Sequence, residues 1–177
     1  MLTAEDKAER SRQRMLEKAK EYQTGTYINR FVAPIFQQVI RAEAAALPQG
    51  LTVVIVSGEV GQSFRRVGEC ACVTCGTVRV WNSGILGMHT GHFLGSRRNA
   101  ILFEDDNCAP QCHSCNYYPT NVPEAYLLWM RTVRPEAIER LEKLKTTSRT
   151  FTREELVDMR IGFKMRLDAA VERMSGG

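Results

Sequence analysis

Apolar side chains recur at helical spacing near both ends of the chain and at strand spacing only in its middle. The clearest helical pattern lies in residues 152–174, where apolar positions stand three or four residues apart. They are Leu156, Met159, Phe163, Leu167, Ala170 and Met174. Thr152 and Glu155 have the spacing of a capping box at the start of this segment. The chain is therefore expected to end in a long amphipathic helix.

Four shorter segments have helical patterns: 3–23, 26–46, 122–131 and 135–146. Thr3 followed by Asp6 predicts a capped start for the first helix. Because its apolar stripe is narrow, this helix is expected either to remain a solvated arm or to bind a partner. Pro34 is expected to break or kink the second helix. Residues 1–50 are interpreted as a helical N-terminal extension.

The middle of the chain, residues 51–120, has a different character. The stretch "LTVVIV" at 51–56 is short and rich in β-branched residues, which predicts a buried strand. The rest is rich in glycine and cysteine, with short strand candidates near 78–81 and 85–93. We therefore expect an α+β protein with a small core over 51–120. Basic helices in 121–177 are expected to pack on that core.

The charge pattern suits a polyanionic partner without requiring one. The chain has 24 basic and 20 acidic residues, giving a net charge of +4. Residues 131–177 alone contain 11 basic and 8 acidic residues, so the last third is the most basic part. Without an apolar run of membrane-spanning length or a signal-like start, the protein is expected to be soluble and cytoplasmic.

Two C-x-x-C turns are the strongest chemical signal. They lie in "CVTCG" at 72–76 and "CHSCN" at 112–116. Each turn supplies two thiolates, so together they predict a closed, tetrahedral structural zinc site. Its expected ligands are Cys72, Cys75, Cys112 and Cys115. Buried free thiols or a redox pair are the alternative.

Two further cysteines and one histidine are left over by this assignment. Cys70 and Cys108 are expected to be small buried hydrophobic residues, with substitution as zinc ligands as the alternative. His113 lies inside the second turn and is expected to face solvent.

The segment between the two turns contains "MHTGHF" at 88–93, with His89 and His92, and later Asn107; Asn116 follows the last cysteine. A single histidine is usually structural, but these residues lie together in one zinc-clamped segment. Phosphodiester hydrolysis needs a base that titrates near neutral pH and a divalent ion that holds the phosphate. Imidazole supplies the base. Mg²⁺ needs only one or two protein ligands.

The order of these motifs resembles the phage lambda NinG (Rap) recombination nuclease family. The resemblance rests on C-x-x-C, then "HTGHF", then "RRNAILFEDDNCAPQCHSCN", and finally "FTREEL" at 151–156. It covers roughly residues 70–174. In plan, this unit is similar to zinc-clamped His-Me finger (HNH) nucleases such as phage endonuclease VII. The likeness implies a ββα-metal fold and a metal-dependent DNA endonuclease, with branched or structured DNA as substrate in phage recombination.

The resemblance also implies residue roles. His92 matches the general base, and Asn116 matches a ligand of the catalytic divalent ion, Mg²⁺ or another. Asn107 matches the asparagine that braces the loop and orients the base. Related nucleases often place a metal ligand directly before the base, but this chain has Gly91 there. Residues one and three before the base share a strand face, so His89 is the expected replacement; exchanged roles or a structural His89 are the alternatives.

Other residues are candidates for contact with DNA or partners. Arg97 and Arg98 are expected to bind phosphates, or else to form a solvated loop. Tyr117 and Tyr118 are expected to pack against the zinc-binding turn rather than stack on bases. The N-terminal helices are a possible dimer or protein interface. The alternative to a nuclease is a non-catalytic zinc-ribbon module that binds DNA or protein.

Overall fold

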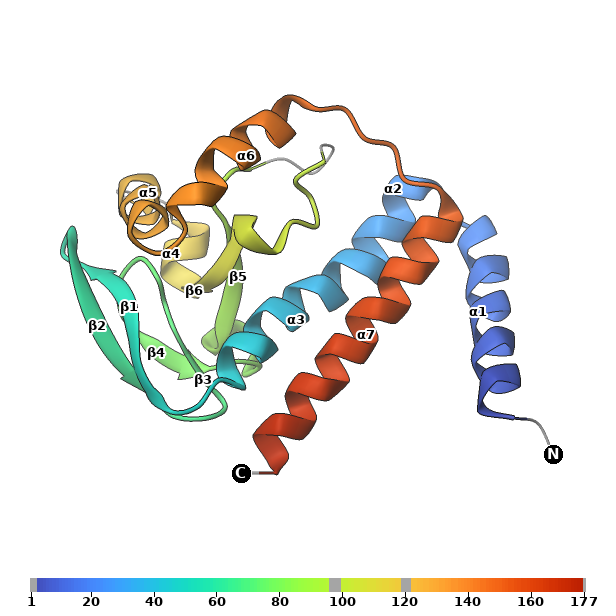
Figure 1. Ribbon diagram of the computed structural model, residues 1–177, viewed down its shortest axis with the longest axis horizontal. Helices are drawn as coiled ribbons and strands as arrows, with labels where there is room; N and C mark the ends of the chain where they lie inside the picture. The colour runs from blue at the N-terminus through green and yellow to red at the C-terminus, as the bar shows by residue number, and fades with distance from the viewer. Residues whose placement is uncertain (1–2, 96–99, 119–121, 177) are drawn as a thin grey trace.

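The chain folds into a mixed α+β structure of small antiparallel hairpins flanked by N- and C-terminal helices (Figure 1). The computed structural model describes residues 3–95, 100–118 and 122–176. The candidate DNA contacts Arg97 and Arg98 lie outside these residues. Within the described residues, no helix is long and apolar enough to cross a membrane.

The N-terminal region forms helix α1 (Ala4–Lys20), helix α2 (Thr24–Tyr27), a π-helical turn (Ile28–Val32) and helix α3 (Ala33–Ala45). The predicted capping box of Thr3 and Asp6 is present. Pro34 stands in the first turn of α3, where its missing N–H has no helical partner to lose. The α-helical pattern is nevertheless interrupted directly before Pro34 by the π-helical turn, which agrees with the expected break or kink.

Three helices follow in the C-terminal third: α5 (Val122–Val133), α6 (Pro135–Thr146) and α7 (Arg153–Ser175). The Thr152 and Glu155 capping box is present. Figure 1 shows α7 running beside α3, with α1 on its other side. Arg166 of α7 pairs with Glu43 of α3 at 2.7 Å. The predicted helical tail thus packs against the predicted N-terminal extension.

Within the described part of the chain, the strands form three separate antiparallel hairpins. The first joins β1 (Gly50–Val56) to β2 (Glu59–Arg65) through Ser57 and Gly58, which both have positive φ angles, as a tight two-residue turn requires. The second joins β3 (Glu69–Ala71) to β4 (Val78–Val80). The third joins β5 (Met88–His92) to β6 (Cys108–Cys112).

The β5–β6 hairpin lies at the centre of the structure. Its register is regular, from Met88 opposite Cys112 to His92 opposite Cys108. Helix α4 (His113–Tyr117) follows β6 directly and contacts β5. Helix α3 lies between this hairpin and α7 (Figure 1). A strand, a second strand and a short helix therefore succeed one another here, with α3 packed beside them.

Candidate active site and metal centre

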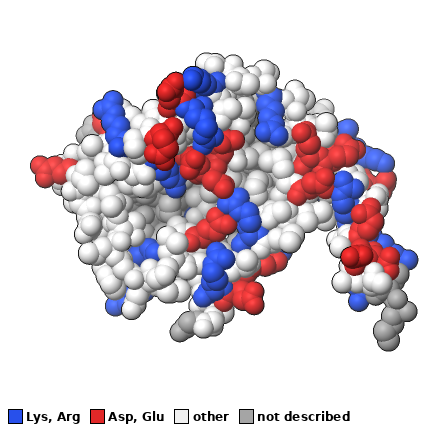
Figure 2. Space-filling model, in the orientation of Figure 1, with Lys and Arg blue, Asp and Glu red and all other residues white. Residues whose placement is uncertain are grey.

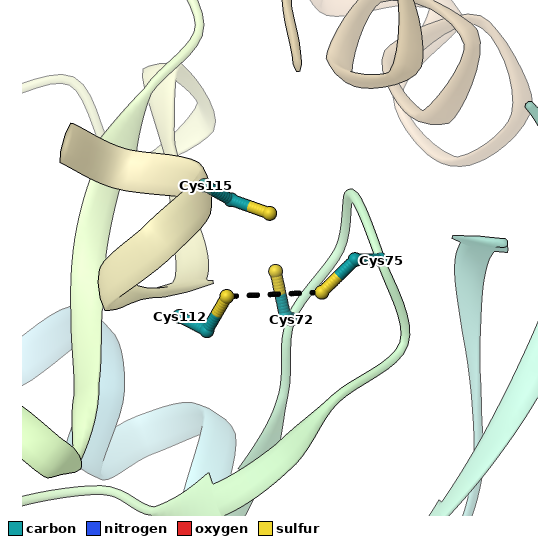
Figure 3. Close-up of side chains that lie close together, drawn as sticks. All are labelled: Cys72, Cys75, Cys112 and Cys115. Atoms are coloured by element: carbon teal, nitrogen blue, oxygen red, sulfur yellow. Dashed lines mark hydrogen bonds between the residues drawn. The ribbon is translucent and has the colours of Figure 1, made fainter. Parts of the chain in front are cut away.

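Four cysteines from two distant segments meet at one point. The side chains of Cys72, Cys75, Cys112 and Cys115 point toward one another (Figure 3), and their sulfur atoms all lie within 4.8 Å of one another. Cys72 and Cys75 come from the loop after β3, while Cys112 and Cys115 lie at the end of β6 and in α4. The two predicted C-x-x-C turns are therefore brought together.

The geometry of this group is consistent with a structural zinc site. Four sulfurs at about 2.3 Å from a tetrahedral zinc would lie about 3.8 Å apart. The Cys75 and Cys112 sulfurs are 3.7 Å apart, close to that spacing. Because all four donors come from the protein, a bound zinc would have no open coordination position. The group would therefore join the β3–β4 segment to the β5–β6 hairpin.

Neighbouring threonines make polar contacts with the cysteine sulfurs. Burial raises the pKa of Cys75, but hydrogen bonds with Thr77, Cys72 and Cys115 outweigh burial and bring it down to about 7. The Cys75 Sγ and Thr77 Oγ1 atoms are 3.3 Å apart. Burial raises the pKa of Cys72 to about 11. The thiols thus differ in how readily they ionise, and metal binding would deprotonate all of them.

The two surplus cysteines are buried outside this group, as expected. Cys70 is 1% exposed and Cys108 is 0% exposed. The Cys70 thiol donates a hydrogen bond to the backbone carbonyl of Arg41. Burial raises the pKa of both thiols above the usual range. Both are therefore neutral packing residues.

Both candidate histidines lie on β5 and line one pocket of about 630 Å³. In a regular ladder, successive side chains point to opposite faces, so His92 shares a face with Thr90 and His89 shares the other with Gly91. Asn116 and Tyr117 of α4 also line the pocket. The predicted base and both predicted ligands of the catalytic ion are thus brought to a single pocket.

Helix α3 supplies the opposite wall of this pocket. Its Phe36, Gln37 and Arg41 are among the lining residues. The Thr90 hydroxyl donates to the Gln37 carbonyl at 2.7 Å, which fixes β5 to α3. Among the described residues, the pocket lining contains no carboxylate. Arg41 carries the one fixed charge of that described lining, and this charge is positive.

His89 lies in a group of aromatic rings at the rim. Its Nε2 is 3.3 Å from the Ile85 carbonyl oxygen, and its ring centroid is 5.2 Å from that of His113. Contrary to expectation, His113 is partly buried, and its Nδ1 is buried without a hydrogen-bond partner among the described residues. Tyr117 stacks on His113 at 4.6 Å but remains 63% exposed. Tyr118 is 70% exposed.

The space beside Gly91 is already filled. A Cβ atom at this position would collide with the Gln111 side chain, which is buried and donates to Thr74 Oγ1 at 3.1 Å. The Tyr126 hydroxyl also donates to the Gly91 carbonyl. A larger residue could not stand here without moving Gln111. This packing explains why the position before His92 has no side chain.

Asn107 bridges the two ends of the loop that connects β5 to β6. Its Oδ1 accepts from the Leu94 N–H at 2.9 Å, and its Nδ2 donates to the Leu94 carbonyl at 3.0 Å. The backbone carbonyl of Asn107 also accepts from the Phe93 N–H. Asn107 is 0% exposed. These bonds hold the residues immediately after His92 in place.

Three arginines hold the acidic stretch before Asn107. Arg140 pairs with Glu104 and Asp106, both at 2.6 Å, and Arg166 pairs with Asp105 at 2.9 Å. Arg134 donates to the backbone carbonyls of Asp105, Asp106 and Cys108. These acidic groups are therefore neutralised within the protein.

The basic C-terminal third does not form a uniform positive surface on the face shown in Figure 2, where acidic and basic side chains intermingle. Lys143 pairs with Glu139 at 2.6 Å, and Arg149 approaches Glu155 at 3.9 Å. Arg153 donates to the carbonyls of Ala19 and Tyr22. Several basic side chains of this segment therefore bind carboxylates or carbonyls of the protein itself.

Arg41 is the pocket residue that the sequence did not indicate. It lies on α3, far from the histidines in sequence, and donates from Nε to the Trp81 carbonyl at 3.1 Å. Its Nη1 is 3.4 Å from Thr90 Oγ1. Burial lowers its pKa, although an arginine remains protonated at neutral pH. Only the tertiary packing of α3 against β5 brings it to the site.

The chain was compared with models of known protein families. The family described as the bacteriophage lambda NinG protein matches residues 62–172, which include both cysteine turns, the histidine strand and most of α7. The chain belongs to the NinG family. No curated protein and no solved structure matches the chain.

Proposed function

We propose that this protein is a metal-dependent DNA endonuclease with a ββα-metal catalytic unit formed by β5, β6 and α4. The observation that carries the proposal is that His92, His89 and Asn116 all line one pocket, whose described lining contains no carboxylate. Membership of a phage family supports a role in phage DNA recombination, with branched or structured DNA as substrate. The four-cysteine group would hold structural zinc and keep β5, β6 and α4 together.

In this proposal His92 is the general base. It stands at the end of β5, and Leu94, two residues further on, is held at both its N–H and its carbonyl by Asn107. A fixed backbone keeps the imidazole in one position, which is a requirement for removing a proton from an attacking water. Imidazole is the side chain that most often serves as a general base in proteins.

His89 and Asn116 are the residues that would hold the catalytic divalent ion. Two protein ligands suit Mg²⁺, which keeps several waters and binds phosphate oxygens directly. When bound, the ion would supply charge stabilisation for the phosphate and the departing oxygen. The absence of carboxylates from the described pocket lining leaves room for the negative charge of the DNA backbone.

The decisive experiment incubates the protein with supercoiled plasmid and with synthetic four-way junctions, in Mg²⁺ or in EDTA. Cleavage is expected only with Mg²⁺ and is expected to fall about 10²–10⁴-fold in His92→Ala, the usual contribution of a general base. Phe64→Ala, an exposed β2 residue outside the pocket lining, is the matched control. Cleavage that persists in EDTA and in His92→Ala would refute the mechanism.

The same assay separates the roles of the two histidines. His89→Ala is expected to raise the Mg²⁺ concentration needed for half-maximal cleavage, whereas His92→Ala is expected to lower the maximal rate at saturating Mg²⁺. Reversed results would assign the base to His89. DNA binding without cleavage under any metal condition would instead favour a non-catalytic zinc-ribbon module. A preference for junctions over linear duplex tests the proposed substrate class.

A further inference from the structure

Arg41 differs from the other well-anchored arginines of the protein in having spare hydrogen-bonding capacity beside the pocket. Its contacts are the Nε bond to the Trp81 carbonyl and the long Nη1 approach to Thr90. A guanidinium group has five N–H donors. These two contacts hold the side chain in place but leave most of its donors without a protein acceptor among the described residues.

Arg65 provides the contrast. Its Nε, Nη1 and Nη2 donate to Thr52 Oγ1 and to the Leu47 and Pro48 carbonyls. It is 5% exposed and does not line the pocket. Its bonding is therefore directed entirely into the fold. Arg41 is held by only one short bond, and its side chain borders a cavity of about 630 Å³.

The ion pairs of the arginines also indicate that Arg41 has capacity for a ligand. Arg166 and Arg140 each pair with two carboxylates. No described carboxylate forms an ion pair with Arg41, although the residue is partly buried. Partial burial of a cation without an opposing charge is unfavourable. Arg65 also has no carboxylate partner, but two carbonyls and a hydroxyl compensate its charge. Arg41 has only one carbonyl and a long contact with Thr90, so an anionic group in the pocket would supply the acceptors that it lacks.

We propose that Arg41 binds a phosphate group of the DNA backbone in this pocket. A planar guanidinium donates two parallel hydrogen bonds to phosphate oxygens, which suits an arginine already oriented by a backbone carbonyl. The proposal rests on DNA being the ligand of the proposed nuclease. It also assigns a ligand-binding role to α3, which lies outside residues 62–172 matched by the family.

The test measures DNA binding by fluorescence anisotropy with the full chain, in buffer without chelator or added Mg²⁺ so that zinc in the cysteine group is retained, at several salt concentrations. The probe is a labelled four-way junction with duplex arms. Loss of one phosphate contact makes the plot of log K against log salt shallower by about 0.9. Arg41→Gln is expected to show this change and a lower affinity. Arg41→Lys, which keeps the charge, is expected to retain the wild-type slope.

Arg153→Gln is the matched control, because Arg153 also donates to backbone carbonyls but lies on α7 outside the pocket lining. Its slope is expected to equal that of the wild type. An unchanged slope in a folded Arg41→Gln variant, or equal changes in both variants, would overturn the proposal.

A second measurement applies if Arg41→Gln does not fold. Arginine Nε–H signals of the wild-type protein are followed by NMR during titration with inorganic phosphate, and the Arg41 signal is identified by its absence in Arg41→Lys. A selective shift of that signal supports the site, and no shift refutes it. Because neither test requires catalysis, an Arg41 effect without any DNA cleavage would reject the nuclease proposal and keep the phosphate site.

Discussion

The four-cysteine group and the histidine pocket both draw residues from one short ββα segment, yet they are built differently. The cysteine group offers four donors of one kind, all directed at a single point. The pocket offers imidazole, amide and guanidinium groups around a cavity. A complete donor set suits a metal that maintains structure, whereas an incomplete one leaves positions for water and substrate. The two sites therefore differ in whether their donor set is complete.

The largest effect is expected from breaking the cysteine group. Structural zinc sites contribute about 10–16 kcal/mol of binding free energy, which is available only to the folded state. Cys112→Ser is therefore expected to lose zinc and to unfold the β5–β6 hairpin and α4. Elemental analysis gives the zinc content, and circular dichroism follows folding. Cys70→Ala should retain one zinc per chain, and equal zinc loss in both variants would contradict the assignment.

The next largest effect is expected from removing the hydrogen bonds between Asn107 and Leu94 beside the pocket. Asn107→Ala leaves the Leu94 N–H and carbonyl without their partner, at about 1–3 kcal/mol for each buried unpaired group. Urea unfolding is expected to show this loss, together with slower cleavage because His92 is held less firmly. Asn82→Ala, at an exposed position, should leave both quantities unchanged. Similar stability in the two variants would argue against the brace.

A smaller effect is expected where the pocket lacks a side chain. Gly91→Ala should destabilise the protein by about 1–3 kcal/mol, the usual cost of overpacking, because the new Cβ would collide with Gln111. In a Gln111→Ala background the same change should cost much less. Gly95→Ala is the control, since its Cβ would meet nothing within 4 Å. Thermal unfolding of the four variants measures this coupling.

The smallest effect is expected at the surface of the acidic stretch. The Arg140 side chain is 45% exposed where it pairs with Glu104 and Asp106. Exposed ion pairs contribute about 0.2–1 kcal/mol each, so Arg140→Ala should cost little stability, and less at high salt. A double-mutant cycle with Glu104→Ala measures the pair. A loss comparable to that of Asn107→Ala would show that the ion pairs, rather than the asparagine, hold the loop.

Features set by local sequence were predictable. The capping boxes at Thr3 and Thr152 join residues three positions apart, so they form as the pattern indicates. The spacing of the cysteine turns also implied their convergence, because one metal needs both pairs. Strand β1 was expected from its β-branched run, but it is not the buried strand that this run predicted: Val54 and Ile55 are buried, whereas Leu51 and Val56 are exposed. Strand β6, by contrast, contains cysteine, proline and glutamine and has no recognisable strand pattern of its own.

Features that depend on distant contacts were not predictable. Gln111 occupies the space beside Gly91 only because β5 and β6 pair in this register. Arg41 reaches the pocket because α3 packs against β5, and no local pattern marks it. His113 was expected to face solvent, since its position in a cysteine turn does not reveal the rings of His89 and Tyr117 beside it.

The position of α3 has a practical consequence for any shortened version of this protein. A fragment that begins at residue 62, where the family match starts, would keep every histidine and all six cysteines. It would nevertheless remove Phe36 and Val39, which are at most 1% exposed and share one core cluster with Phe163 and Leu167 of α7. Such a fragment would lack the α3 wall of the pocket and would expose apolar side chains to solvent, so a shortened chain that keeps the whole pocket must begin before Asn29.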